Sequence, residues 1–206
     1  MKNSKNITKS FIKKSTPNSH EVKDAKYYED AEGNKYYVDG KNVVIDYSVS
    51  EKNVANWLKE TFGGEIYMLP RINIPEGIQT ADYLFRGEKW DLKEIKSTGK
   101  NVLDNRVNGL KKQSNNFIFD ISNTSISIKE IKNQINKLYE SPNRKWINKI
   151  MLIKNQKLIC IYIRKKRLTI SQKGPMTNLK CIHKHILLYN IQNVNKIIHV
   201  IEAQRN

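Results

Sequence analysis

The residues best suited to chemistry are two aspartates and a lysine in the segment TADYLFRGEKWDLKEIKS, Thr80 to Ser97. This segment predicts two short strands joined by a tight turn at Arg86-Gly87-Glu88. The first strand carries Asp82, and the second carries Asp91-Leu92-Lys93, which has the pattern Asp-x-Lys. Such a spacing can hold a divalent metal ion beside a positive charge.

Alternate side chains of a β-strand share a face, so Asp91 and Lys93 should project to the same side. Trp90 and Leu92 would then point to the opposite side, where they fit a core. Asp82 on the neighbouring strand can lie near Asp91 across the pair. Two carboxylates this close repel each other, and a divalent cation compensates the repulsion. The metal ion would polarise a phosphoryl oxygen and lower the pKa of a bound water, while Lys93 would stabilise the developing negative charge or orient the water.

The same residues also fit a simpler interpretation, a solvent-exposed strand face with an ion pair. In addition, Glu94-Ile95-Lys96 is a second (D/E)-x-K pattern in the next register. One regular strand cannot turn both patterns to the same site. Trp90 and Leu92, which share a side with Glu94, favour Asp91 and Lys93 as the functional pair. A β-bulge near Glu94 would bring that residue in as a third ligand.

The composition indicates a polyanionic partner. The chain has 206 residues, of which 38% are hydrophobic and 28% are charged, so we expect one domain with extensions or at most two small domains. Lys and Arg number 37 against 20 Asp and Glu, a formal net charge of +17. This surplus favours nucleic acid as the partner over a membrane surface. A lysine-rich composition also arises from an AT-biased genome, without any role in binding.

Several classes of protein are disfavoured by what the sequence does not contain. Cys160 and Cys181 form neither a disulfide framework nor a four-ligand zinc set, which suits a reducing compartment. No phosphate-binding loop or dinucleotide fingerprint is present. No apolar run approaches the roughly 20 residues that cross a bilayer, and the basic N-terminus lacks the apolar middle of a signal peptide. We therefore expect no membrane span and a protein that starts in a cytoplasm, although export by a non-classical route would leave no trace in the sequence.

The chain divides into four predicted segments. Residues 1–20 are rich in Lys, Ser, Asn and Thr and predict a basic, disordered N-terminal arm. Residues 21–45 carry aromatic and β-branched residues broken by Gly-containing turns, which predicts a β-meander. Residues 46–166 predict an α/β domain, and residues 167–206 form a C-terminal extension whose apolar residues follow no settled period.

Within residues 46–166, helices and strands alternate. A helix is predicted from an N-cap at Ser50 to Gly63-Gly64, and a second over residues 102–113. The almost wholly apolar FIFDIS predicts a central strand that is buried on both faces. The amphipathic segment SIKEIKNQINKLYES predicts a third helix, followed by a hairpin around Asn155-Gln156. This order predicts a central mixed β-sheet flanked by helices.

The segment TADYLFRGEKWDLKEIK resembles the PD-(D/E)XK motif of the restriction-endonuclease-like nuclease superfamily. More narrowly, it is similar to the C-terminal tRNA nuclease domains of bacterial contact-dependent growth inhibition toxins, and to related modules at the end of phage head-morphogenesis-type proteins. The likeness covers residues 43–163 and includes NVANWLKETFGG, PRINIPEGIQTADYL, WDLKEIK and NNFIFDIS. One departure is visible, because Ala81 stands where the motif has proline; that position shapes the backbone and does no chemistry.

The resemblance implies a role for each matched residue. Asp82 and Asp91 would be the metal ligands and Lys93 the catalytic lysine. An acid on the first helix joins such sites, and of the two candidates, Glu51 and Glu60, we favour Glu51 because it lies at the helix start. Gln113 would face the site from a basic helix. The predicted catalytic set is therefore Asp82, Asp91, Lys93, Glu51 and Gln113, and the predicted nucleic-acid-binding lysines are Lys96, Lys100, Lys111 and Lys112.

The implied activity is hydrolysis of RNA phosphodiester bonds, with tRNA as the expected substrate and Mg²⁺ as the expected cofactor; Mn²⁺ and Zn²⁺ are alternatives. A toxin of this kind would act in the cytoplasm of a target cell, delivered from another cell or as part of a phage or mobile element. It would have a cognate immunity protein as partner. The sequence leaves the oligomeric state, the tRNA species and the delivery route open.

Two other functions are carried as alternatives: a DNA endonuclease of the same fold, and a non-catalytic nucleic-acid-binding accessory protein of a phage or mobile element. A metal-free histidine ribonuclease is disfavoured because residues 46–166 contain no histidine. Cys181, His183 and His185 lie close enough in sequence to suggest zinc ligands, but no second cluster completes a site.

Overall fold

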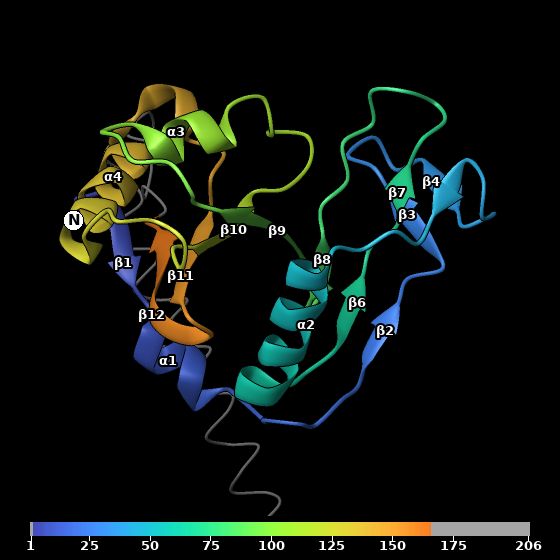
Figure 1. Cartoon of the computed structure of the whole chain (residues 1–206), viewed down its shortest axis with the longest axis horizontal. Coiled ribbons are helices and arrows are strands. Elements are labelled where there is room, and N and C mark those ends of the chain that lie inside the picture. Colours follow the sequence, from blue (N-terminus) through green and yellow to red (C-terminus); the bar gives the residue numbers. More distant parts are fainter. Residues whose placement is uncertain (1, 166–206) are drawn as a thin grey trace, which may run out of the picture. The chain divides into compact units, whose positions relative to one another are not determined.

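The fold is built around a mixed β-sheet, which a computed structural model describes for residues 2–165. Eight strands follow the order β1-β12-β11-β10-β9-β8-β6-β2 (Figure 1). β9, β10 and β11 pair in parallel at the centre, and β2 pairs in parallel with β6, whereas the other neighbours are antiparallel. The mixed α/β architecture expected from the sequence is thus confirmed.

The two edge strands of the large sheet, β1 and β2, have three residues each, and its longest strands are β9 and β12. The bounds of its strands are β1 Ser4–Asn6, β2 Val22–Asp24, β6 Ile66–Met68, β8 Tyr83–Phe85, β9 Glu88–Glu94, β10 Asn116–Asp120, β11 Lys149–Lys154 and β12 Lys157–Arg164. As expected, FIFDIS contributes a central strand, because β10 lies between β9 and β11 and is buried on both faces.

Helices cover both faces of this sheet (Figure 1). α2 (Val49–Phe62) and the short α1 (Thr8–Lys13) pack on one face, where Trp57, Phe62 and Trp90 are buried in one cluster. α3 (Val102–Val107) and α4 (Ile128–Glu140) pack on the other face, and a 3₁₀ turn, η1 (Pro142–Arg144), follows α4. None of the helices in residues 2–165 has the length and hydropathy that crossing a bilayer requires.

Two small sheets complete the described part of the chain. β3 (Tyr27–Glu29) and β4 (Lys35–Tyr37) form a hairpin, and β5 (Val43–Val44) pairs with β7 (Arg71–Ile72). Their buried residues form a third cluster, which includes Tyr28, Leu69 and Ala81. This cluster places β3 and β7 next to the segment that leads into β8.

The two predicted hairpins of the large sheet are present. Arg86 and Gly87 both have positive φ, 52° and 74°, between β8 and β9. Asn155 and Gln156 have φ of 48° and 54° between β11 and β12. Two successive positive φ angles define the two-residue turn whose twist matches that of antiparallel strands. The first of these turns sets Tyr83 opposite Trp90, which fixes the register of the candidate site.

The expectation of a disordered arm over residues 1–20 is wrong for its first half. β1 pairs with β12, and Ile7 N donates to Ile161 O at 2.8 Å. Phe11 on α1 packs edge-on against Phe62, with ring centroids 5.2 Å apart. Phe11-Ile12 is the one adjacent apolar pair in this segment, and pairing with a strand more than 150 residues away leaves no local pattern.

Two helix boundaries also differ from the prediction. The N-cap of α2 is Ser48 and not Ser50, because Ser48 Oγ accepts from Glu51 N while Glu51 Oε2 accepts from Ser48 N. The helix predicted over residues 102–113 ends at Val107, and Gly109 with a φ of 79° turns the chain away. Gln113 therefore lies in a turn beside β9 and not on a helix.

We predict that α1 contributes to stability through Phe11. Phe11→Ala removes the ring that packs against Phe62 and should lower the free energy of unfolding by about 2 kcal/mol, less than a fully buried Phe because Phe11 is half-buried. Ile12, 51% exposed on the same helix, is the matched control, and Ile12→Ala should change little. Urea denaturation measures both. Equal, negligible effects would mean that this segment does not pack in solution.

Candidate active site

Asp82 and Asp91 face each other where β8 begins. Asp82 directly precedes β8, and its backbone N donates to Trp90 O at 3.1 Å, which continues the ladder with β9. Asp82 Oδ2 then accepts a hydrogen bond from Leu92 N at 2.6 Å. The two carboxyl groups interact directly. This interaction raises the pKa of Asp82 and lowers the pKa of Asp91. Only 7% of Asp82 and none of Asp91 is exposed.

Lys93 and Gln113 hold the two oxygens of Asp91. Lys93 Nζ lies 2.6 Å from Asp91 Oδ2 in an ion pair that lacks hydrogen-bond geometry. Gln113 Nε2 donates to Asp91 Oδ1 at 2.8 Å and also to Thr80 O. Gln113 Oε1 is buried and accepts no hydrogen bond from residues 2–165. Asp91 and Lys93 thus share a face of β9, as strand alternation predicts.

Glu51 reaches the site from the first turn of α2. Its Oε1 pairs with the Arg71 guanidinium, and its carboxyl group is close enough to Asp82 for a hydrogen bond between them to influence its pKa. Tyr83 OH donates to Glu51 O at 2.9 Å, which ties the start of α2 to β8. Glu60, the other candidate acid, is exposed nine positions later, about 13 Å along the helix axis. The structure therefore brings Glu51 and not Glu60 to the aspartates.

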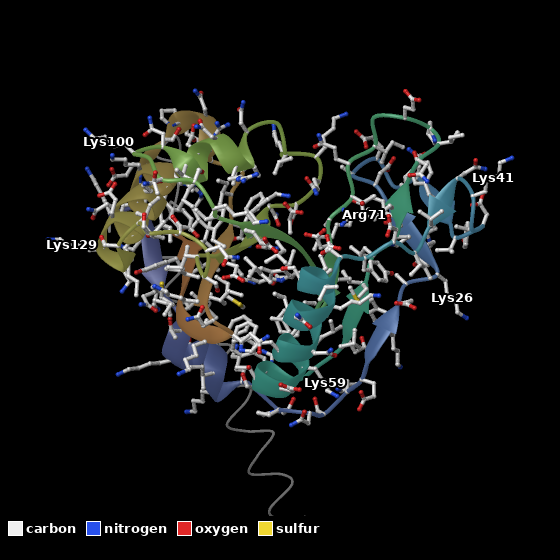
Figure 2. The ribbon with its side chains drawn as sticks, viewed as in Figure 1. Lys26, Lys41, Lys59, Arg71, Lys100 and Lys129 are labelled. Carbon is white, nitrogen blue, oxygen red and sulfur yellow. The ribbon has the colours of Figure 1, made fainter. Side chains whose placement is uncertain are left out.

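Arg71 is a site residue that the sequence analysis missed. It belongs to β7, and Figure 2 shows it near the N-terminal end of α2. Its guanidinium pairs with Glu51 and lies 3.4 Å from Asp82 Oδ1, so one cation bridges two acids. The segment EIYMLPRI gives no local signal for this contact, because the acids that Arg71 meets are 20 residues before it and 11 after it.

Burial and mutual repulsion set the charge state of the three acids. Burial, and then the negative charge of Asp91, raise the pKa of Asp82 from 3.8 to about 8. Burial also raises the pKa of Asp91, although the Lys93 ammonium opposes this. For Glu51, burial is outweighed by the hydrogen bond from Ser48 N and by the Arg71 guanidinium, so its pKa is lowered. Burial is thus the largest contribution to the raised pKa of both aspartates, and it favours the protonated form of Asp82 up to about pH 8.

The carboxylates of the site fit a hard divalent cation that takes two ligands from the protein. Carboxylate oxygens are the ligands that Mg²⁺ prefers, and it is commonly bound by one or two carboxylates, with waters and substrate phosphate oxygens as its other ligands. Asp82 and Asp91 provide two such groups on one face. No three His, Cys, Asp or Glu side chains among residues 2–165 are arranged to hold a metal ion, and Glu51 and Asp82 are instead bridged by Arg71.

The competing motif Glu94-Ile95-Lys96 does not join the site. β9 pairs with β10 without a shift from Asp91 to Glu94, so the bulge that would bring Glu94 in is not formed. Glu94 instead pairs with Lys96 at 3.0 Å. The zinc candidates Cys181, His183 and His185 lie outside the described residues, as does the predicted extension over residues 167–206.

The four candidate nucleic-acid-binding lysines fall into two groups. Lys111 and Lys112 line a cavity of about 370 Å³ together with Gln113, so they flank the site. Lys96 is paired with Glu94, and Lys100 lines a separate cavity between α3 and α4. The structure thus places Lys111 and Lys112 beside Gln113, with Lys112 paired to Glu32 at 3.2 Å, and leaves Lys96 and Lys100 elsewhere.

Residues 79–159 match the family model described as "Contact-dependent growth inhibition CdiA C-terminal domain". The matched segment contains both aspartates, Lys93 and Gln113, whereas Glu51 and Arg71 precede it. This match supports the resemblance drawn from the sequence as far as the contact-dependent growth inhibition system.

Among solved structures, the chain is similar to one in "CdiA-CT/CdiI toxin and immunity complex from Burkholderia pseudomallei". The two are 19% identical, the match covers 62% of this chain and 98% of that chain, and the TM-score is 0.43. A comparison with curated proteins gives no match.

We predict that Asp82 makes the stability of the metal-free protein fall with rising pH. Its folded-state pKa of about 8 lies above the ordinary value of 3.8, so the folded state binds the proton more tightly. The resulting stabilisation is complete below the ordinary pKa and is lost as the pH rises toward 8. Asn cannot ionise, so Asp82→Asn should gain free energy of unfolding relative to wild type between about pH 5 and about pH 8.

Urea denaturation in EDTA measures this difference. Glu76→Gln, which replaces an exposed acid, is the control and should follow the wild-type pH profile. A constant offset between Asp82→Asn and wild type at both pH values would contradict the elevated pKa.

Proposed function

We propose that this chain is a metal-dependent nuclease that hydrolyses RNA phosphodiester bonds, with tRNA as its substrate. The observation that carries the proposal is the convergence of Asp82, Asp91 and Lys93 in one buried site, with Gln113 on one side and Glu51 on the other. Buried, mutually repelling carboxylates with raised pKa values are costly, and such groups concentrate at functional sites. The net charge of +17 supplies the attraction for a polyanion.

A divalent cation bound by Asp82 and Asp91 would polarise the scissile phosphate and lower the pKa of a water molecule. Lys93 places an ammonium beside Asp91 Oδ2, where it can stabilise negative charge as it develops on the phosphate. Gln113 fixes the other oxygen of Asp91, so that carboxylate cannot rotate away. Arg71 holds Glu51 and Asp82 together, which keeps the acid of α2 in place beside the aspartates.

The biological setting we propose is that of a contact-dependent toxin. The family match over residues 79–159 supports it. In this setting the protein acts in the cytoplasm of a neighbouring cell after delivery, and a cognate immunity protein protects the producing cell.

The buried acids argue against one of the alternative functions and leave the other open to test. A non-catalytic binder of nucleic acid gains nothing from burying acids, because each one repels phosphate and costs free energy to desolvate. A DNA endonuclease would use the same carboxylates and lysine, so only the choice of substrate separates it from the RNA nuclease. Nicking of plasmid DNA with RNA left intact would select the DNA enzyme.

We predict Mg²⁺-dependent cleavage of total tRNA that EDTA abolishes. Asp91→Asn and Lys93→Met should each lower the cleavage rate by about 100-fold or more, because each removes one charge that acts on the reacting phosphate. Lys129→Met, at an exposed position on α4, is the control for Lys93→Met. Denaturing gel electrophoresis measures the rates. Cleavage that persists in Asp91→Asn, or in EDTA, would exclude this mechanism.

We predict that the acid on α2 is Glu51. Glu51→Gln should lower the rate by about 10-fold or more, because it removes the negative charge next to Asp82. Glu60→Gln, on the same helix and exposed, should retain wild-type activity. The same gel assay, with circular dichroism to confirm folding, compares the two variants. Equal rates for both would show that α2 contributes no acid to the reaction.

A further inference from the structure

A second cavity lies on the same sheet face as the two aspartates. Its volume is about 740 Å³, which is within the range of ligand-binding pockets. Its walls come from the link between β2 and β3, from β3 itself and from strands of the large sheet. The side chains that matter for its chemistry are Tyr27, Tyr67, Leu84, Lys23, Lys26 and Lys89.

The sheet register relates this cavity to the candidate active site. Tyr67 pairs with Leu84, and Leu84 pairs with Lys89, so these three residues form one row across β6, β8 and β9. Leu84 is two residues after Asp82, and Lys89 is two residues before Asp91. Residues two apart on a strand share a face and lie about 7 Å from each other. The floor of the cavity is therefore the row adjacent to the aspartate pair.

Lys89 also connects the cavity with the other side of the site. It lines both this cavity and the 370 Å³ cavity that contains Gln113 and Lys111. Since Gln113 donates to Asp91, an unbroken series of neighbouring residues leads from the aspartates to the larger cavity. Lys89 and Gln113 thus connect the two cavities with the aspartate pair.

The lining combines apolar and aromatic surface with positive charge. Lys23 and Lys26 are exposed and form no ion pair with any of residues 2–165. The lining holds three lysines, Lys23, Lys26 and Lys89, against two acids, Asp24 and Glu29, and Glu29 already pairs with Lys35 at 3.8 Å. The charge left to attract a ligand is therefore positive.

We propose that this cavity is a nucleotide-binding subsite, which receives an unpaired base of the RNA substrate next to the cleaved phosphate. Tyr27 and Tyr67 supply aromatic surface for stacking, and Leu84 supplies an apolar floor. Lys23 and Lys26 lie where they can contact the flanking phosphates. The inference rests on the proposed function, since it places the subsite relative to the scissile phosphate. It restricts the substrate to RNA with a single-stranded segment at the cleavage point, because a base paired in a duplex cannot enter a cavity.

Binding of a defined RNA tests the subsite without requiring cleavage. The probe is a single-stranded RNA of about ten nucleotides that carries one 2-aminopurine, titrated with the full chain in EDTA. Stacking on tyrosine should quench 2-aminopurine fluorescence. Tyr67→Leu and Tyr27→Leu should each raise the Kd by about 5- to 100-fold and reduce the quenching, whereas Tyr67→Phe, which retains an aromatic ring, should bind as wild type does.

A charge variant provides a second test that does not depend on the packing of the cavity. Lys26→Gln should weaken binding several-fold and make the Kd less dependent on salt. Lys129→Gln, an exposed lysine on α4, is the matched control (Figure 2). Circular dichroism melting confirms that each variant is folded.

The outcomes separate the subsite from the proposed function. If all variants bind the RNA as wild type does, the subsite proposal is wrong, even when wild type cleaves tRNA. The expected occupant of the cavity is then a protein partner. If the tyrosine variants lose binding and quenching while wild type shows no metal-dependent cleavage, the subsite stands and the proposed nuclease activity fails.

Discussion

Two carboxyl groups buried face to face are the constraint on which the rest of this structure depends. Burial, and then the negative charge of Asp91, raise the pKa of Asp82 to about 8, so placing the two carboxyl groups together out of reach of water is costly. The fold surrounds them with a compensating group from each direction, namely Leu92 N–H from β9, Gln113 from a turn, Lys93 from β9 and Arg71 from β7. Each of these groups would be misplaced by a small shift of the element that carries it.

Packing on both faces of β9 provides the required rigidity. Trp90 and Leu92 are buried against α2, while Ile95, the residue after β9, is buried against α3 and α4, so the strand cannot rotate without opening a core. α2 is fixed in turn by the hydrogen bond from Tyr83 OH to Glu51 O. The residue pattern that places Asp91 and Lys93 on one face is therefore the pattern that holds the strand between two cores.

Features governed by local rules could be predicted from the sequence, and features governed by distant pairing could not. The turn at Arg86-Gly87 and strand alternation place Asp82, Asp91 and Lys93 correctly, because both rules operate within a few residues. The N-cap was assigned to Ser50, not Ser48, because both serines precede the same apolar pattern. Arg71 and β1 were missed for a different reason. Their partners lie far away in sequence. A single arginine does not reveal its partner, and a strand of three residues is too short to show an alternating pattern.

The charge distribution couples substrate binding to the charge state of the site. A chain with a net charge of +17 attracts a polyanion at long range, but the three acids repel a phosphate at contact. Arg71 and Lys93 offset part of that repulsion, while burial keeps the pKa of both aspartates raised. A further positive charge beside Asp91 would therefore make the approach of a phosphate more favourable. On electrostatic grounds, a divalent cation and a phosphate should enter this site more readily together than a phosphate alone.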